Sequence, residues 1–269
     1  MHNAAFRELG LDDWRYEAID VEPERFEALV RELPARGFAG ANVTIPHKLR
    51  ALADADTASD VSRVVGAANT LVFEQGAVHA HNTDVEGFLA ALREQAPEAP
   101  GGMRALVLGA GGAGRAVVYA LIEAGAAAVE VWNRHPARAE ELVSHLEVAG
   151  SATELTATTA PNLDRTDLLV NATSVGMVSH GPDPNAPGEP DPIKELPLTA
   201  DELSDRLIVV DLVYRQERTP LLRAALARGL RSADGIDVLV HQGAASFRLW
   251  TGMTAPLGAM RSGATNGAD

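Results

Sequence analysis

The sequence predicts an α/β fold, with a mainly parallel sheet in the first part of the chain and a doubly wound sheet in the middle. Short apolar runs of strand length alternate with helical patterns along most of the chain. A glycine-rich turn at 109–114 joins one such run to a helix, and a proline- and glycine-rich loop, 96–102, precedes this unit. With 269 residues, 46% of them hydrophobic, the chain can bury a large core in one or two domains.

The first part of the chain alternates between predicted helices and strands and ends in a hairpin turn at Gln75-Gly76. This order indicates a mainly parallel sheet with an antiparallel addition. The predicted helices are 2–9, 23–33, 47–53, 57–63 and 85–95, and the predicted strands are 14–21, 38–43, 67–73 and 78–80.

The middle of the chain predicts a β-α-β unit. The apolar run 105–108 leads into Gly109, Gly111 and Gly114, and a helical pattern then ends at Gly125 before a second strand, 129–132. In a Rossmann-type domain the first glycine permits the tight turn, the second lets the backbone approach a pyrophosphate, and the third lets helix and strand pack closely. The spacing therefore favours dinucleotide binding at the helix start over an ordinary strand–helix turn.

The end of the second strand favours NADP over NAD. NAD sites place an acidic residue there to bind the ribose 2′-hydroxyl, whereas this chain has Asn133 and Arg134, with Arg138 four residues further on. Guanidinium groups bind a 2′-phosphate through charge-assisted hydrogen bonds. The alternative is that both arginines are solvated surface charges.

Further elements complete the predicted doubly wound domain and lead to a C-terminal helix. A long surface loop is expected over 178–200. The predicted helices are 137–147, 220–228 and 238–250, and the predicted strands are 168–171 and 207–211.

Composition excludes several classes of function. The net charge is −14 without a basic stripe, so nucleic acid is not an expected partner. The chain has no cysteine, which excludes disulfides and thiolate metal sites and fits a cytoplasmic protein. No apolar run approaches membrane-spanning length, and no G-x-S-x-G or H-E-x-x-H motif occurs, so we expect neither a membrane partner nor a metal.

Two polar motifs follow predicted strands in the first domain. They are N-V-T-I-P-H-K, residues 42–48, and H-N-T-D, residues 81–84. Ligands in open α/β sheets collect at the carboxyl ends of strands, so Lys48 and Asp84 are candidates for an acid–base dyad. The alternatives are that both are surface charges, and that His81 and Asp84 cap a turn or bind a metal.

Several motifs in a common order resemble the shikimate dehydrogenase family over essentially the whole chain. Together they are specific, although the glycine turn alone would not be. They are N-V-T-I-P-H-K (42–48), G-A-A-N-T-L (66–71), H-N-T-D-V-E-G (81–87), G-A-G-G-A-G-R-A (109–116), N-R-H-P-A-R-A (133–139), N-A-T-S-V-G-M (171–177), D-L-V-Y (211–214), T-P-L-L (219–222) and D-G-I-D-V-L-V-H-Q-G-A-A-S-F-R-L-W-T-G (234–252).

The resemblance implies reversible hydride transfer between NADPH and the C3 carbonyl of 3-dehydroshikimate, which gives shikimate. It implies a substrate domain of 1–84 plus 236–262 and a Rossmann-type NADP domain of 85–235, with 263–269 expected as a disordered tail. Monomer and homodimer both stay open.

The resemblance also assigns residues to roles, in the numbering of this chain. Lys48 would exchange the proton at the reacting oxygen, and Asp84 would orient it and the substrate hydroxyls. The substrate contacts would be Thr44, Asn69, Tyr214 and Gln242. The cofactor contacts would be Gly109, Ala110, Gly111, Gly112, Ala113, Asn133, Arg134 and Arg138, with Asp60, Leu212 and Gly235 as further cofactor-side positions and 171–177 near the nicotinamide.

The chain departs from the family pattern at two places. His135 stands where the family often has Thr, although His can still donate to a phosphate. The family usually opens with a strand and an S-x-S-P-x-x-H-N-x-A-F motif, whereas this chain starts at Met1-His2-Asn3, in register with its end. We therefore expect Met1 to be an internal methionine of a longer protein, and the serines that bind the substrate carboxylate to lie upstream.

Two alternatives to a shikimate dehydrogenase stay open at this point. One is a relative that uses quinate, an aminoshikimate or NAD. The other is a nucleotide-binding homologue with little activity. The missing N-terminal motif favours this alternative, whereas the presence of Lys48 and Asp84 argues against it.

Overall fold

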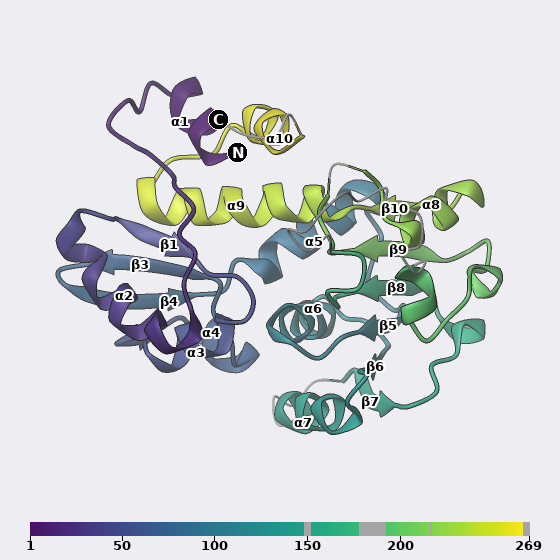
Figure 1. The fold of residues 1–269 in the computed structure, drawn as a ribbon. Helices are drawn as coiled ribbons and strands as arrows, with labels where there is room; N and C mark the ends of the chain where they lie inside the picture. The colour runs from purple at the N-terminus through teal and green to yellow at the C-terminus, as the bar shows by residue number, and fades with distance from the viewer. Residues whose placement is uncertain (148–151, 178–191, 216, 266–269) are drawn as a thin grey trace. The chain divides into compact units, whose positions relative to one another are not determined.

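The computed structural model describes residues 1–147, 152–177, 192–215 and 217–265. The chain forms two compact α/β units (Figure 1), which confirms the predicted fold class. Unit 1 contains Met1–Phe88 and Val240–Asp269, and unit 2 contains Leu89–Leu239. The chain passes from unit 1 to unit 2 within helix α5 and returns within helix α9.

The sheet of unit 1 is mostly antiparallel, whereas the sequence led us to expect a mainly parallel one. Strand β3 pairs antiparallel with β1 and β4, and only the two-residue β2 runs parallel to its neighbour β4. The hairpin predicted at Gln75-Gly76 joins β3 to β4, with both residues at positive φ. The order is β1 (Gly40–Asn42), β3 (Thr70–Glu74), β4 (Ala77–His81), β2 (Thr57–Ala58).

Helices cover the sheet of unit 1. Phe26 and Val30 of α2 pack in one core cluster with Leu71, Val78 and Ala80 of the sheet. The helices with most of their residues in unit 1 are α1 (His2–Glu8), α2 (Phe26–Glu32), α3 (Lys48–Ala53), α4 (Asp60–Val65), α9 (Gly235–Thr251) and α10 (Leu257–Thr265); α5 (Asp84–Gln95) begins in unit 1, and the short helices η1 (Pro23–Arg25) and η2 (Pro34–Arg36) flank α2.

The segment 14–21, which the alternating pattern predicts as a strand, is not one in the structure. The backbone of this segment forms hydrogen bonds with a side chain instead of with a neighbouring strand. Tyr16 N donates to Asn3 Oδ1 at 2.7 Å, and Asn3 Nδ2 donates to Tyr16 O at 3.0 Å. The predicted helix 57–63 is also shifted, since β2 occupies its first two residues and α4 begins at Asp60.

Unit 2 contains the predicted doubly wound sheet. Its six strands are all parallel, with β8 and β5 at the centre. The order is β10 (Ser232–Ala233), β9 (Ile208–Asp211), β8 (Leu168–Asn171), β5 (Arg104–Leu108), β6 (Ala128–Trp132), β7 (Glu154–Thr158). The sequence did not reveal β10, which has two residues, or β7, whose only buried residue is Leu155.

The helices of unit 2 follow their strands as expected. The β-α-β unit around α6 has the predicted form, and Gly125 follows the helix at a φ of 78°. The helices are α6 (Gly112–Glu123), α7 (Pro136–Glu147) and α8 (Pro220–Ala227), with the short helices η3 (Leu163–Arg165), η4 (Pro192–Glu195) and η5 (Ala200–Glu202). Most of the long loop predicted at 178–200 lies outside the described residues.

The C-terminal end differs from the expected disordered tail. Helix α10 extends through Thr265, so residues 263–265 are helical, while 266–269 lie outside the described residues. Gly263 lies against Ala4 and Met1, which ties this helix to the N-terminus. In the described part of the chain, every helix is too short or too polar to cross a membrane.

We predict that Gly87→Ala destabilises unit 1. A Cβ at Gly87 in α5 would lie 2.5 Å from Gln242 N in α9, so the two helices would have to move apart. The cost should be about 1–3 kcal/mol of unfolding free energy. Gly258→Ala is the control, because a Cβ there meets no atom within 4 Å in the part of the chain that the structure describes. It should be neutral or stabilise by up to about 1 kcal/mol. Urea unfolding followed by circular dichroism tests this, and equal midpoints for both variants would contradict the packing described.

Candidate functional site

Lys48 and Asp84 are each the first residue of a helix in unit 1. A turn precedes Lys48, in which His47 N donates to Thr44 O at 2.9 Å. The His47 ring stacks on Phe26 with centroids 4.7 Å apart, which fixes the start of α3. Before α5, Asn82 Oδ1 accepts from Asp84 N at 3.1 Å, as a capping residue does.

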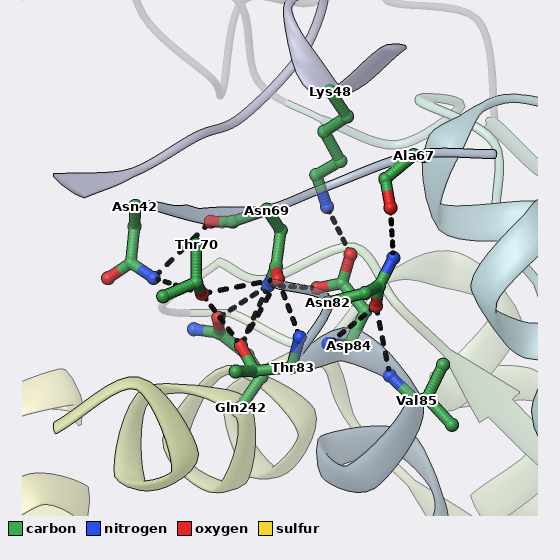
Figure 2. Close-up of polar contacts among 10 residues, drawn as sticks. All are labelled: Asn42, Lys48, Ala67, Asn69, Thr70, Asn82, Thr83, Asp84, Val85 and Gln242. Atoms are coloured by element: carbon green, nitrogen blue, oxygen red, sulfur yellow. Dashed lines mark hydrogen bonds and ion pairs between the residues drawn. The ribbon is translucent and has the colours of Figure 1, made fainter. Parts of the chain in front are cut away.

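The two side chains form the ion pair that the sequence suggested. Lys48 Nζ lies 2.7 Å from Asp84 Oδ2 (Figure 2). Both side chains are largely buried, 14% and 13% exposed, yet each keeps some access to solvent. Asp84 also lies at the N-terminal end of α5, where the helix dipole favours a negative charge. A partly buried ammonium and carboxylate in contact can exchange a proton with a bound molecule.

Asn69 holds the carboxylate in place. It directly precedes β3 and is 2% exposed. Its Nδ2 donates to Asp84 Oδ1 at 2.8 Å and is also 3.0 Å from Thr83 Oγ1. Its Oδ1 accepts from Thr83 N at 2.7 Å. Because both ends of the amide are used, Asn69 fixes the position of Asp84 relative to β3 (Figure 2).

Gln242 belongs to the same network, although it lies far away in the sequence. Its Oε1 accepts from Asn69 Nδ2 at 3.1 Å, and its side chain is 8% exposed. Helix α9 brings it there, and Gly87 allows this close approach. The structure therefore brings together four of the predicted residues, namely Lys48, Asp84, Asn69 and Gln242.

Sequence reasoning assigned no role to three further members of this network. Thr83 and Thr70 are fully or almost fully buried, and their hydroxyls lie 3.0 Å apart. Asn42 Nδ2 donates to Thr70 Oγ1 at 3.2 Å. Asn42 and Thr83 lie inside the two polar motifs, which was the available signal, but sequence cannot tell a buried amide or hydroxyl from an exposed one.

Two predicted residues of unit 1 stand outside this network. The side chain of Thr44 is exposed in the turn before α3. Asp60 begins α4 with a side chain 98% exposed and pairs with Arg63 at 2.6 Å. The structure gives Thr44 room to contact a ligand, whereas Asp60 has the surroundings of an ordinary surface charge.

In unit 2 the glycine turn has the predicted geometry. Gly109 has a φ of 110°, a conformation that favours glycine. A Cβ at Gly114 would lie 2.0 Å from Gly109 O, so the turn and helix α6 pack too closely for a side chain. A Cβ at Gly111, by contrast, would meet no atom within 4 Å among the other described residues outside its own helix backbone. Gly111 is exposed at the start of α6, where free N–H groups can bind an anion.

The end of β6 reaches the same turn. Asn133 Oδ1 accepts from Ala110 N at 3.3 Å, and Asn133 Nδ2 donates to His135 O at 2.9 Å. Arg134 and Arg138 are exposed, and neither forms an ion pair with any residue that the structure describes. These guanidinium groups are therefore available to an anionic ligand.

Two loops after the neighbouring strands β8 and β9 carry the remaining predicted residues, and a buried aspartate joins them. Leu212 and Tyr214 follow β9, and the last residue of that strand, Asp211, is fully buried. Asp211 Oδ1 accepts at 2.9 Å from Nδ2 of Asn171, the last residue of β8. Burial raises the pKa of Asp211 to about 6, and the nearby Asp234 adds to this effect. The sequence contained this residue in the D-L-V-Y motif but gave it no role.

Gly235 lies against the loop after β9. A Cβ there would lie 2.5 Å from Val213 O and 2.6 Å from Tyr214 N. This close contact places Gly235 beside the loop that carries Leu212 and Tyr214. Among the residues that the structure describes, no group of three or more His, Cys, Asp or Glu could hold a metal ion.

Three family models match successive parts of the chain. Residues 1–71 match the shikimate dehydrogenase substrate binding domain, and residues 92–178 match the family described as shikimate / quinate 5-dehydrogenase. Residues 235–262 match the shikimate 5'-dehydrogenase C-terminal domain.

Relatives and solved structures agree with these matches. The shikimate dehydrogenase (NADP(+)) of Methanopyrus kandleri is 43% identical over 97% of this chain and 88% of its own length. The structure of Thermus thermophilus shikimate 5-dehydrogenase with NADP(H) and shikimate is 39% identical, with a TM-score of 0.83 over 98% of this chain and 92% of that one. The ligand-free 5-ketofructose reductase of Gluconobacter sp. strain CHM43 is 32% identical, with a TM-score of 0.81 over 98% and 91%. The chain thus belongs to the shikimate dehydrogenase family.

Proposed function

We propose that this protein is an oxidoreductase that catalyses the reversible NADPH-dependent reduction of 3-dehydroshikimate to shikimate. The observation that carries the proposal is the partly buried pair of Lys48 and Asp84, 2.7 Å apart and held by Asn69. Carbonyl reduction needs a proton donor at the oxygen that becomes the hydroxyl. The similarity to the Methanopyrus kandleri enzyme over nearly the whole chain supports the choice of substrate and cofactor.

In this proposal Lys48 is the acid–base residue. Its ammonium donates a proton to the carbonyl oxygen during reduction, and its neutral amine accepts that proton during shikimate oxidation. Asp84 keeps the amine directed at the reacting oxygen and stabilises the ammonium after each oxidation. The carboxylate keeps a fixed position because Asn69 binds its second oxygen at 2.8 Å.

Short polar side chains orient the substrate. A polyhydroxylated carboxylate offers several hydrogen-bonding groups, and a few fixed donors and acceptors select one orientation. Asn69 and Gln242 are held by the network around Asp84, while Thr44 and Tyr214 are exposed and can turn to a ligand. We assign these four residues to substrate binding.

The chain fits NADP through residues of unit 2. The first turn of α6 and the open space at Gly111 suit a pyrophosphate. Arg134 and Arg138 suit the 2′-phosphate, and Asn133 shapes the turn beside them. When bound, NADPH supplies the hydride that the carbonyl carbon receives. Of the other cofactor-side positions, we assign Leu212 and Gly235 to the cofactor, whereas Asp60 pairs with Arg63 as an exposed surface charge and receives no role.

The lack of cysteine fits a reducing compartment, and we place the reaction in the cytoplasm. The chain acts as a monomer or a homodimer on a small-molecule substrate. The similarity to 5-ketofructose reductase makes a different hydroxy ketone the second candidate substrate.

The main test compares kcat/KM for the oxidation of shikimate and quinate with NADP and NAD and, separately, for the reduction of 3-dehydroshikimate and 5-ketofructose with NADPH, where 3-dehydroshikimate should be preferred. We expect shikimate with NADP to give the highest value for oxidation. A preference of the unchanged protein for another substrate or for NAD would overturn the assignment.

Replacing both Arg134 and Arg138 by Ala should raise the KM for NADP by about ten- to a hundredfold, because two hydrogen bonds to a charged group are lost. The KM for NAD should stay the same.

We predict that Lys48→Ala lowers kcat for shikimate oxidation by about 10²–10⁴-fold, the usual effect of losing a general acid–base group. NADPH binding, measured by fluorescence titration, should not change, because the glycine turn lies in unit 2. Arg50→Ala is the matched control: it removes a cation from the same helix whose partners are Asp54 and Glu27 at the surface. Unchanged turnover of the Lys48 variant would rule out its proposed role.

Two glycine variants separate cofactor binding from folding. Gly111→Ala should leave Tm unchanged, because its Cβ has open space among the residues that the structure describes, but should weaken NADPH binding by about tenfold or more, equivalent to about 1.4 kcal/mol. Gly114→Ala should lower Tm, because its Cβ would overlap Gly109 O. If Gly111→Ala binds NADPH as the unchanged protein does, the pyrophosphate lies elsewhere.

A further inference from the structure

The buried aspartate at the end of β9 joins three segments of unit 2. Asp211 Oδ1 accepts from Asn171 Nδ2 at 2.9 Å and from Val213 N at 3.1 Å. Its Oδ2 accepts from Thr219 Oγ1 at 2.6 Å. Thr219 is the capping residue of α8, where its Oγ1 accepts from Leu222 N. One side chain thus contacts the last residue of β8, the loop after β9 and the capping residue of α8.

Asn171, which Asp211 holds in place, in turn binds the loop after β8. Its Oδ1 accepts from Thr173 N at 3.1 Å and from Thr173 Oγ1 at 2.7 Å, and its Nδ2 lies 3.4 Å from Val175 O. Asp211 and Asn171 are paired in the parallel register of β8 and β9 and are 0% and 1% exposed. The loop 172–177 is therefore fixed by side chains that water does not reach.

The same loop lies against the glycine turn. A Cβ at Gly109 would lie 2.8 Å from Ala172 O and 3.1 Å from Thr173 N. On the other side, the backbone of Val213 and Tyr214 lies against Gly235. A shift of either loop would thus displace backbone that packs directly on the predicted cofactor positions.

We propose that Asp211 is a positioning residue for NADP binding, which holds the loops after β8 and β9 in the arrangement that the cofactor contacts. This inference rests on the proposed function and extends it to a residue that touches neither substrate nor the glycine turn. The acceptor oxygen Oδ1 is the important atom, because it accepts from the side chain of Asn171, which binds the loop after β8, and from Val213 N in the loop after β9. An isosteric amide keeps that oxygen.

Folding alone does not require a carboxylate here. Burial raises the pKa of Asp211 to about 6, so this carboxyl binds more protons in the folded protein than in the unfolded chain between about pH 4 and 6. The contribution of Asp211 to the free energy of unfolding therefore falls as the pH rises through this range, and its ionised form is a cost above it. Asp234 is the charged group that acts on Asp211, and it adds to this cost. Asp211→Asn should consequently be at least as stable as the unchanged protein at pH 8.

The test measures the Kd for NADPH by fluorescence at pH 8, well below the Tm of each variant. Asp211→Ala should bind NADPH about tenfold more weakly or worse, since the buried donors Asn171 Nδ2 and Val213 N lose their acceptor, whereas Asp211→Asn should stay within about threefold. Asp167→Ala is the matched control, because this aspartate precedes β8, the strand next to β9, and accepts from Arg104 N at the opposite end of these parallel strands from Asp211. It should bind NADPH normally.

A purely structural role predicts a different pattern. Asp211→Ala would then have a lower Tm and an unchanged Kd, and this result would overturn the inference. If Asp211→Ala does not fold, Asn171→Ala takes its place, with the same loss of NADPH affinity expected and an unchanged Kd as the contradicting result. If the unchanged protein binds no NADPH, the proposed function fails. If it binds NADPH and the Asp211 and Asn171 variants bind it equally well, only the role of Asp211 fails.

Discussion

The hydrogen bonds of the Asn69 side chain are the constraint on which the candidate site depends. A carboxylate beside an ammonium can rotate, and the ion pair alone does not fix a direction for proton transfer. Asn69 binds the second oxygen of Asp84 and the backbone of Thr83 with the two ends of one amide. It is buried, so these bonds do not compete with water. The position of Lys48 Nζ follows from the position of Asp84.

Each unit holds some of its predicted functional residues in fixed positions, although the backbone geometry of the two units differs. In unit 1 the network closes on Gln242, which can approach because residue 87 is a glycine. In unit 2 close approach of backbone also requires glycine, at Gly109, Gly114 and Gly235, and the loops between these contacts are tied to Asp211. In both units, glycines allow close backbone packing, and a buried polar side chain then determines the position of the functional group.

The sequence predicted the parts of this arrangement that depend on local patterns. The β-α-β unit around Gly109 and the position of Lys48 and Asp84 after strands were predictable, because apolar periodicity and glycine spacing are local signals. The antiparallel pairing of β1 with β3 was not predictable, because a strand of three residues gives no signal for the direction of its partner strand. The segment 14–21 alternates like a strand, but the Asn3 side chain that binds its backbone cannot be foreseen from a pattern. The roles of Thr83, Thr70 and Asp211 depend on burial, which single residues do not show.

The most direct test of the account is a crystal structure of the protein with shikimate and NADP. We predict that Lys48 Nζ and a carboxylate oxygen of Asp84 both lie within hydrogen-bond distance, about 2.6–3.2 Å, of the substrate hydroxyl that is oxidised. Asn69 should still bind Asp84 in that complex. A structure in which shikimate places another group at this hydroxyl, with Lys48 directed away from it, would contradict the account.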